Sequence, residues 1–567
     1  MSRRGSTDQR RAPSEHLGGG GRPLVHLEQA TTLRRLRHVL QGPTIALGII
    51  LLVISLSARF AGAQQVEQPF PAEEWTIEQL RQSGAADLDD FTRDDKRLRG
   101  TFIKRLLTGS IPGLPGRVSL RHAHCATRLE IKKLSIGIEA VFENCRFRRD
   151  VELSEVTFDK MLTFEACTFE GTFRIRSCNF RKPVSFGHSV LEGAFDCEDC
   201  LGPGFSAGLD LSYISVKGDC TIKKCTVNAE ATGQAAFNGL HAFVGGDLDL
   251  TGSTFGGGVV LNTAIVTGGV SLQGGTFSGG IDGIELVVGK QLLVVEVAFR
   301  SSALVSFNSA KVGGHCMFYA DGLKATECDG PLDLLRASIG GNLQLQFLAC
   351  RYVGRGRAAC DVRGVHVTGS VLTKGLQRGV RIQVGGMRYE EIKTNEKPEE
   401  WRDLLELLGE AEFSADGYAQ AEQYLVRVGR RDLADDVYVS MRRRQVAEVT
   451  GRSLAGRGWD WVLDNVAVFG RAPSRQLYCG LALFVFGWLW AFRVQHMVPS
   501  DGGNWYDKYE AWWFSLEALL PLVDLNTVRR WRPGDDQAFA RAWFRVHRLA
   551  GWFLVSVALG SLTGVIR

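Results

Sequence analysis

Cysteine is the residue type in this chain that could do the most chemistry. The 567 residues include 13 cysteines, and Cys197 and Cys200 form a C-x-x-C pair. Such pairs are typical of redox centres and metal sites, which need accessible thiols with lowered pKa values or converging ligands. Whether these thiols can react therefore depends on where the fold places them.

Two histidines and an acidic patch are the other candidate reactive groups. His122 and His124 alternate with Ala123 and Cys125, so both imidazoles should face outward on a strand, where they could hold a metal weakly. No third ligand is evident nearby in the sequence, so solvated histidines are the simpler interpretation. We therefore predict no metal site and no cofactor.

The densest acidic patch could serve a glycoside hydrolase, but a solvated face explains it more simply. The chain also has no dinucleotide-binding glycine motif, P-loop, H-E-x-x-H motif or G-x-S-x-G motif. The sequence therefore identifies no catalytic residue, and an enzyme is only an alternative. The patch consists of Glu192, Asp196, Glu198 and Asp199.

An 11-residue repeat of apolar positions must place these side chains. The repeat starts at Val118, and in each 11-residue unit the residues at offsets 0, +2, +5 and +7 point inward. Residues at the same offset in successive units form a column, and we number these columns one to four in order of offset. Two halves make a coil of about 22 residues that cannot bury its apolar face alone, so coils must stack. The repeat predicts a mainly β fold, a right-handed β-helix, in which Phe147 stacks on Phe169 and Phe158 on Phe180.

The columns change the interpretation of the cysteines. Eleven of the thirteen, including Cys197 and Cys200, fall on columns. Buried free cysteine is common in protein cores, so we predict a packing role for them. In an oxidising compartment, thiols stacked one coil apart could still oxidise, as for Cys145 with Cys167.

Glycines recur two residues before the first column. At these corners the chain must turn sharply, and we predict positive φ angles there, which glycine adopts at the lowest cost. The glycines are Gly246, Gly257, Gly268, Gly279, Gly314 and Gly341.

The charge balance excludes one class of function. The net charge is +5, and residues 118–381 hold 27 basic and 26 acidic side chains. Nucleic-acid binding requires a basic face and DNA mimicry an acidic one. We therefore expect no nucleic-acid partner.

Apolar segments at both ends indicate a membrane protein. Residues 45–58 precede Ala61-Gly62-Ala63 and predict a signal peptide, with an uncleaved anchor as the alternative. Leu477–Phe492 and Leu549–Ile566 are predicted as two transmembrane helices. Residues 512–525, interrupted by Pro521, are too short to span and suit a re-entrant or interfacial segment.

Charges flanking these helices predict the orientation. Six arginines between the two helices place that loop in the cytoplasm, whereas Arg471 and Arg475 argue for the opposite side of the first helix. The larger cluster puts the β-helix in the periplasm. The cluster consists of Arg529, Arg530, Arg532, Arg541, Arg545 and Arg548.

These patterns divide the chain into five parts. A helical stretch around Ala86–Leu107 should cap the β-helix. After the β-helix we expect a helix over 399–408 and then a helix pair around Gly429, which is similar to one tetratricopeptide unit. The parts are a basic N-terminus with the signal segment (1–63), the cap (64–117), the β-helix (118–385), a helical connector (386–475) and the membrane module (476–567).

The end of the chain resembles a known family. Near the end of the chain, the segment FSLEALLP is followed by a closing helix that ends in LTGVIR, and the start of the β-helix carries DDKRLRGTFIKRLL and VSLRHAHCATRLEI. In these two regions the chain resembles bacterial pentapeptide-repeat-type membrane proteins. Their C-terminal two-helix module resembles ion-channel pore domains, and some members carry an oxidoreductase label. The resemblance implies a pore region, although no T-x-G-Y-G filter is present and the coil exceeds the pentapeptide length of 20. The candidate pore residues are Ser515, Glu517, Pro521 and Asp524.

Three functions remain open from the sequence. The first is a binding or scaffold protein anchored at the bacterial inner membrane, with an unidentified protein partner on the β-helix. The second is a channel-like sensor whose pore requires a homo-oligomer. The third is an enzyme on the β-helix surface, such as a membrane-associated oxidoreductase.

Overall fold

The computed structural model describes residues 70–563 with internal gaps, and these belong to one compact unit, Phe70–Arg567. The predicted signal segment, Pro521, most of the helix expected over 399–408 and the last four residues lie outside the described residues. The gaps are 93–95, 202–203, 230–234, 321–324, 347, 353–357, 374–380, 394–404, 406, 449–452, 472, 495–496, 501–507 and 521–522.

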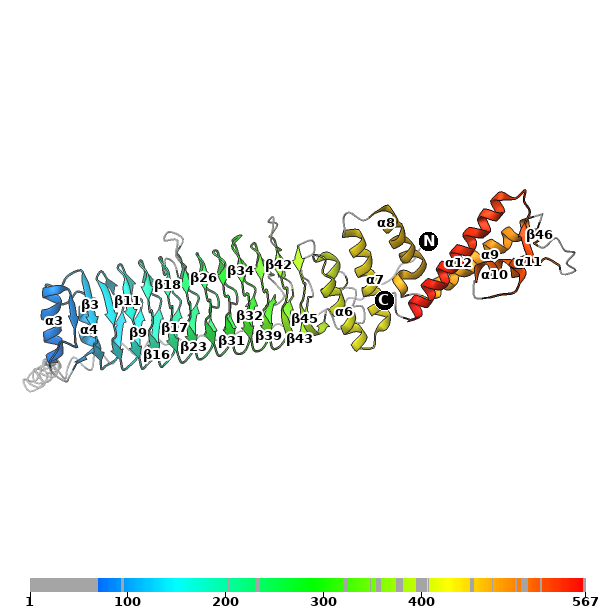
Figure 1. Ribbon diagram of the computed structural model, residues 1–567. Coiled ribbons are helices and arrows are strands. Elements are labelled where there is room, and N and C mark those ends of the chain that lie inside the picture. Colours follow the sequence, from blue (N-terminus) through cyan, green and yellow to red (C-terminus); the bar gives the residue numbers. More distant parts are fainter. Residues whose placement is uncertain are drawn as a thin grey trace, which may run out of the picture. The chain divides into compact units, whose positions relative to one another are not determined.

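Residues 85–393 form a β-solenoid with about 22 residues per coil, as the repeat predicts (Figure 1). One coil contains four short strands: β7 (Glu139–Glu143), β8 (Arg146–Phe147), β9 (Val151–Ser154) and β10 (Thr157–Phe158). The next coil begins with β11 (Leu162–Glu165), which pairs in parallel with β7 and sets Leu162 opposite Ala140. Each coil therefore has four sides, and each side contributes two inward residues.

The first side of every coil joins one continuous parallel sheet of 13 strands. Some coils are longer, and the sheet continues through them: Leu209 lies opposite both Val184 and Phe237, which are 25 and 28 residues away. Its strands are β1 (Ala85–Asp87), β3 (Arg117–Arg121), β7, β11, β15 (Val184–Ser185), β18 (Leu209–Asp210), β22 (Phe237–Asn238), β26 (Val259–Val260), β30 (Ile281–Asp282), β34 (Val305–Ser306), β38 (Leu332–Asp333), β42 (Cys360–Asp361) and β44 (Ile382–Gln383).

The predicted phenylalanine ladders are confirmed. Phe147 stacks on Phe169 with ring centroids 4.8 Å apart, and Phe158 stacks on Phe180 at 4.9 Å, both with planes 10° apart. All four side chains are at most 1% exposed. Parallel strands in register place identical side chains at the strand spacing, which is close to the separation of offset-stacked rings.

The corner glycines do not have the predicted conformation. None of the six has a positive φ; instead, non-glycine residues four positions after the first column do, such as Asn144 (52°), Glu155 (54°) and Ala166 (51°). The glycines are required for close approach between coils. A Cβ atom on Gly268 would lie 2.5 Å from the carbonyl oxygen of Gly246 in the preceding coil.

This packing predicts the effect of a single methyl group. We expect Gly268→Ala to destabilise the solenoid by roughly 1–3 kcal/mol, because the backbone it would strike cannot move independently of its sheet. Gly137→Ala is the matched control, since no atom lies within 4 Å of its added Cβ. Denaturant unfolding followed by far-UV circular dichroism measures both. Equal midpoints for the two variants would contradict the close-approach explanation.

The N-terminal cap contains less helix than predicted. Within the expected helix over 86–107, only α4 (Gly100–Leu107) is helical, while β1 and β2 (Arg97–Leu98) extend the solenoid sheets. A further helix, α3 (Pro71–Ser83), precedes them. Glu73, 1% exposed, accepts hydrogen bonds from the backbone N–H (2.9 Å) and Nε (3.0 Å) of Arg99, which fixes α3 to α4.

Helices follow the solenoid. The predicted pair is present as α6 (Ala415–Arg427) and α7 (Arg431–Glu448), with Gly429 between them at φ 81°. Arg471 contacts both through ion pairs to Glu422 (2.5 Å) and Asp435 (2.6 Å). The remaining elements are α8 (Leu454–Val462), the turns Leu463–Ala467 and Val468–Gly470, α9 (Pro473–Arg493), β46 (Met497–Pro499), α10 (Ala511–Leu519), α11 (Thr527–Arg530), β47 (Trp531–Pro533) and α12 (Ala538–Thr563).

The prediction of two transmembrane helices is corrected to one. Among the described residues, only Ser474–Arg493 of α9 is long and apolar enough to cross a membrane. The second predicted segment belongs to α12, which starts earlier than expected and includes Arg541, Arg545 and Arg548. The described apolar part of this helix, Leu549–Thr563, follows these three arginines.

Candidate functional site

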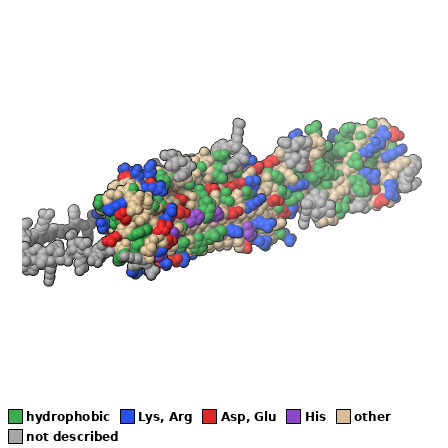
Figure 2. Space-filling model, turned by 60° about the vertical axis from the view of Figure 1, so that its left-hand side comes forward, with side chains coloured by type: hydrophobic (Ala, Val, Ile, Leu, Met, Phe, Trp, Pro, Cys, Tyr) green, Lys and Arg blue, Asp and Glu red, His purple; other side chains and the backbone are tan. Residues whose placement is uncertain are grey.

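The outer face of α9 is an exposed apolar surface. Only 17% of the residues in the apolar stretch of α9 are buried. Leu477, Tyr478 and Phe492 are 72%, 66% and 78% exposed. Figure 2 shows hydrophobic side chains gathered over the C-terminal helices, whereas acidic and basic side chains alternate over the solenoid. An exposed apolar helix of this length indicates contact with lipid or with another protein.

Glycines let α9, α10 and α12 pack closely together. A Cβ on Gly551 of α12 would lie 1.8 Å from the carbonyl oxygen of Leu519 in α10. One on Gly487 of α9 would lie 2.5 Å from both Ser515 Oγ and His547 Cε1. Such small-residue contacts are typical of helices associated in membranes. The packing leaves an apolar cavity of about 680 Å³ between the three helices, open to the outside along α9.

Ser515 lies inside this helix packing. It is fully buried, its hydroxyl donates to the carbonyl of Phe484 (3.0 Å), and its Oγ lies 3.4 Å from His547 Nε2. His547 is 1% exposed, and its Nδ1 has no hydrogen-bond partner among the described residues. His547 could not be recognised from the sequence, because it lies between Arg545 and Arg548, before the apolar segment that begins at Leu549.

The other candidate pore residues are not gathered with Ser515. Glu517 Oε2 accepts the backbone N–H groups of Thr527 (2.6 Å) and Val528 (3.0 Å), so it holds the start of α11. Asp524 is exposed and pairs with Arg529 at 3.0 Å. Pro521 lies outside the described residues, and neither Ser515 nor Glu517 lines the apolar cavity.

The solenoid cysteines are buried thiols, as predicted. All thirteen cysteines are described and free, and twelve are buried; the exception is Cys479 of α9. Cys328, which the column count missed after an insertion, stacks in register on Cys350. Burial raises the pKa of Cys220 and of Cys316 to about 12, which disfavours thiolate chemistry at neutral pH.

Several third-column side chains also form hydrogen bonds that packing alone does not explain. Cys167 Sγ donates to the carbonyl of Phe142 in the preceding coil (3.3 Å). Ser189, one coil later, donates to the carbonyl of Phe164 (3.1 Å) and accepts the N–H of Cys167 (3.1 Å). These thiols and hydroxyls therefore form hydrogen bonds with backbone N–H and C=O groups at the corners, where the chain leaves the regular hydrogen bonding between strands.

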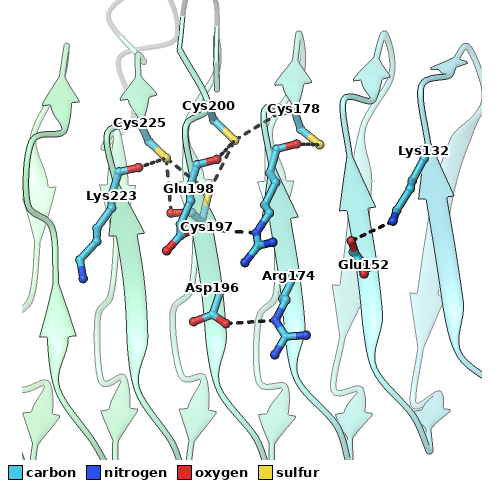
Figure 3. Close-up of polar contacts among 11 residues, drawn as sticks. Lys132, Glu152, Arg174, Cys178, Asp196, Cys197, Glu198, Cys200, Lys223 and Cys225 are labelled. Atoms are coloured by element: carbon cyan, nitrogen blue, oxygen red, sulfur yellow. Dashed lines mark hydrogen bonds and ion pairs between the residues drawn. The ribbon is translucent and has the colours of Figure 1, made fainter.

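Three of the four carboxylates of the acidic patch pair with basic side chains of neighbouring coils. Asp196 pairs with Arg174 on the neighbouring strand of the preceding coil (3.4 Å; Figure 3), and Glu198 pairs with Arg176 (3.8 Å). Glu192 pairs with Lys217. These carboxylates form surface ion pairs between stacked strands, an arrangement that stabilises by at most about 1 kcal/mol each.

His122 has carboxylate neighbours that the sequence analysis did not find. Its Nδ1 lies 2.8 Å from Asp87 and 3.2 Å from Asp89, which β1 places beside β3. Asp89 also pairs with Lys96 through its other carboxylate oxygen (2.5 Å), so ion pairs already use the charge of this group. Burial, together with Arg148, lowers the pKa of His124, which is not part of this group.

One comparison with known proteins finds a similarity. Residues 142–190 match the family described as "Pentapeptide repeats (9 copies)". This match lies within the solenoid, from β7 to β16 (Val190–Leu191). No curated protein and no solved structure matches the chain.

Proposed function

We propose that this chain is a scaffold or binding protein in which α9 anchors the solenoid at the inner membrane of a bacterium. The observation that carries the proposal is the exposed apolar face of α9, which in water would cost about 25 cal/mol for each Å². A solenoid of stacked coils presents a long outer surface of mixed charge, which suits an unidentified protein partner.

The same proposal places the solenoid in the periplasm. In the sequence, the solenoid precedes α9, and three arginines follow it: Arg529, Arg530 and Arg532. Arginine clusters near membrane helices are retained in the cytoplasm. The solenoid, which precedes α9, then lies on the opposite side.

Liposome flotation of the chain from Gln64 onward, without the signal segment, tests the anchor. We expect the unaltered protein to float with the liposomes and the double variant Leu481→Arg/Leu489→Arg to remain unbound. Both leucines are more than half exposed, at 56% and 54%. Leu201→Arg, at a 62% exposed leucine of the solenoid, is the matched control and should float. Flotation of the double variant would contradict the anchor.

The channel-like sensor is the second candidate, favoured by the buried Ser515 and His547. Polar groups within helices at membrane depth are costly and often functional. A pore would need several copies around an axis. Native mass spectrometry and bilayer conductance should then reveal a closed oligomer with a current; a monomer without conductance contradicts this candidate. The ion-paired carboxylates and buried thiols do not favour the enzyme alternative.

A further inference from the structure

Three cysteine sulfurs converge inside the solenoid. Cys197 lies on β17 (Phe195–Glu198), Cys200 at the corner that follows, and Cys225 at the corner after β20 (Cys220–Lys223), one coil further (Figure 3). The Sγ atom of Cys197 is 3.8 Å from that of Cys200 and 3.6 Å from that of Cys225. All three Sγ atoms lie within 4.8 Å of one another, and each residue is at most 1% exposed.

Backbone pairing explains two of these thiols but not the third. Cys200 Sγ accepts the N–H of Cys178 (3.4 Å), and Cys225 Sγ donates to the carbonyl of Lys223 (3.2 Å). Cys197 instead occupies the second column, where its register partners on both sides are isoleucines, Ile175 and Ile222. A cysteine there gives up apolar volume and directs its sulfur at the other two thiols.

The triangle of sulfurs has the dimensions of a metal site. A point equidistant from all three lies roughly 2.3 Å from each, which is the length of a metal–thiolate bond. Thiolates favour soft ions such as Cu(I) and zinc. Zinc in a closed site requires four ligands, and among the described residues no further His, Cys, Asp or Glu atom joins this group. Three-coordinate Cu(I) therefore fits the donor set better than zinc.

We propose that Cys197, Cys200 and Cys225 bind one Cu(I) ion as a trigonal thiolate site that stabilises the middle of the solenoid. Binding releases the three thiol protons. The N–H of Cys178, directed at Cys200 Sγ, offsets part of the negative charge that remains. No coordination position faces solvent, so the ion has a structural rather than a catalytic role. Because the site is closed, the ion enters while the coils assemble.

The test uses the full chain, expressed with added copper and purified under reducing, oxygen-free conditions. Copper per chain is measured by mass spectrometry and its ligands by X-ray absorption. Cys197→Val restores a side chain similar to the neighbouring isoleucines and removes one ligand. Cys220→Val is the matched control, because Cys220 is buried in the same coil as Cys225 but outside the triangle.

We expect the unaltered chain and Cys220→Val to hold one Cu(I) ion bound by three sulfurs, and Cys197→Val to lack it. Copper should also raise the melting temperature of the first two proteins and leave that of Cys197→Val unchanged. An unaltered chain without copper, or with zinc at these sulfurs, would overturn the proposal. So would equal copper contents in Cys197→Val and the unaltered chain.

Discussion

Replacing Phe164 by alanine should destabilise the solenoid by about 3–5 kcal/mol. The Phe164 ring is 2% exposed and stacks between Phe142 (5.0 Å) and Phe186 (5.1 Å). It also meets Phe147, Phe169 and Phe173 edge to face. Because the coils are fixed by their hydrogen-bond ladders, the structure cannot collapse into the cavity, and the lost contacts are not replaced.

Denaturant unfolding of the solenoid signal in circular dichroism measures this effect. Phe243→Ala is the control, since Phe243 lies on β23 (Phe243–Val244) and is 38% exposed. We expect its free energy of unfolding to change by less than about 1 kcal/mol. Similar losses in both variants would show that the interior ladder is not the main source of stability.

Raising the pH above about 9 should unfold the solenoid cooperatively, because its cysteines stay protonated only while folded. Burial raises the pKa of Cys125, Cys220, Cys316 and Cys350 from 9.0 to about 12. Between these values the unfolded chain loses thiol protons that the folded chain keeps. The stabilisation is therefore complete below pH 9 and is lost as the pH rises.

The size of the loss follows from linkage. Each such thiol contributes about 1.4 kcal/mol per pH unit, so four together lower the free energy of unfolding by about 6 kcal/mol at about pH 10. Unfolding under reducing conditions at a series of pH values measures the slope. The double variant Cys220→Val/Cys316→Val should lower it by two proton equivalents. An unchanged slope would mean that these thiols ionise equally in both states.

The solenoid was predictable because its signal is periodic. Apolar offsets in the sequence give the coil length and the columns directly, and they identified most cysteines as interior residues. The role of Gly268 was not predictable, because a glycine needed for close approach and one needed for positive φ look the same in sequence. The Cys197–Cys225 contact was also hidden, since an insertion changes the spacing between their coils.

The C-terminal module was harder to predict. Its apolar segments indicated helices, but α12 begins at Ala538 and carries arginines that the sequence analysis assigned to a loop. The burial of His547 and the hydrogen bonds of Glu517 to the start of α11 depend on contacts between helices. No local pattern encodes such contacts, so the candidate pore residues could be named from resemblance but not placed.

Membrane topology tests the central claim, that α9 crosses the membrane and holds the solenoid outside the cytoplasm. Alkaline phosphatase, active only outside the cytoplasm, is inserted into the full chain in a bacterial host. One insertion follows Gly429, in the turn between α6 and α7 where an added Cβ would meet no atom within 4 Å, and the other follows Asp535, whose side chain is 84% exposed. We predict activity for the first insertion and none for the second. Equal activity at both positions would contradict a spanning α9, and the reverse pattern would contradict a periplasmic solenoid.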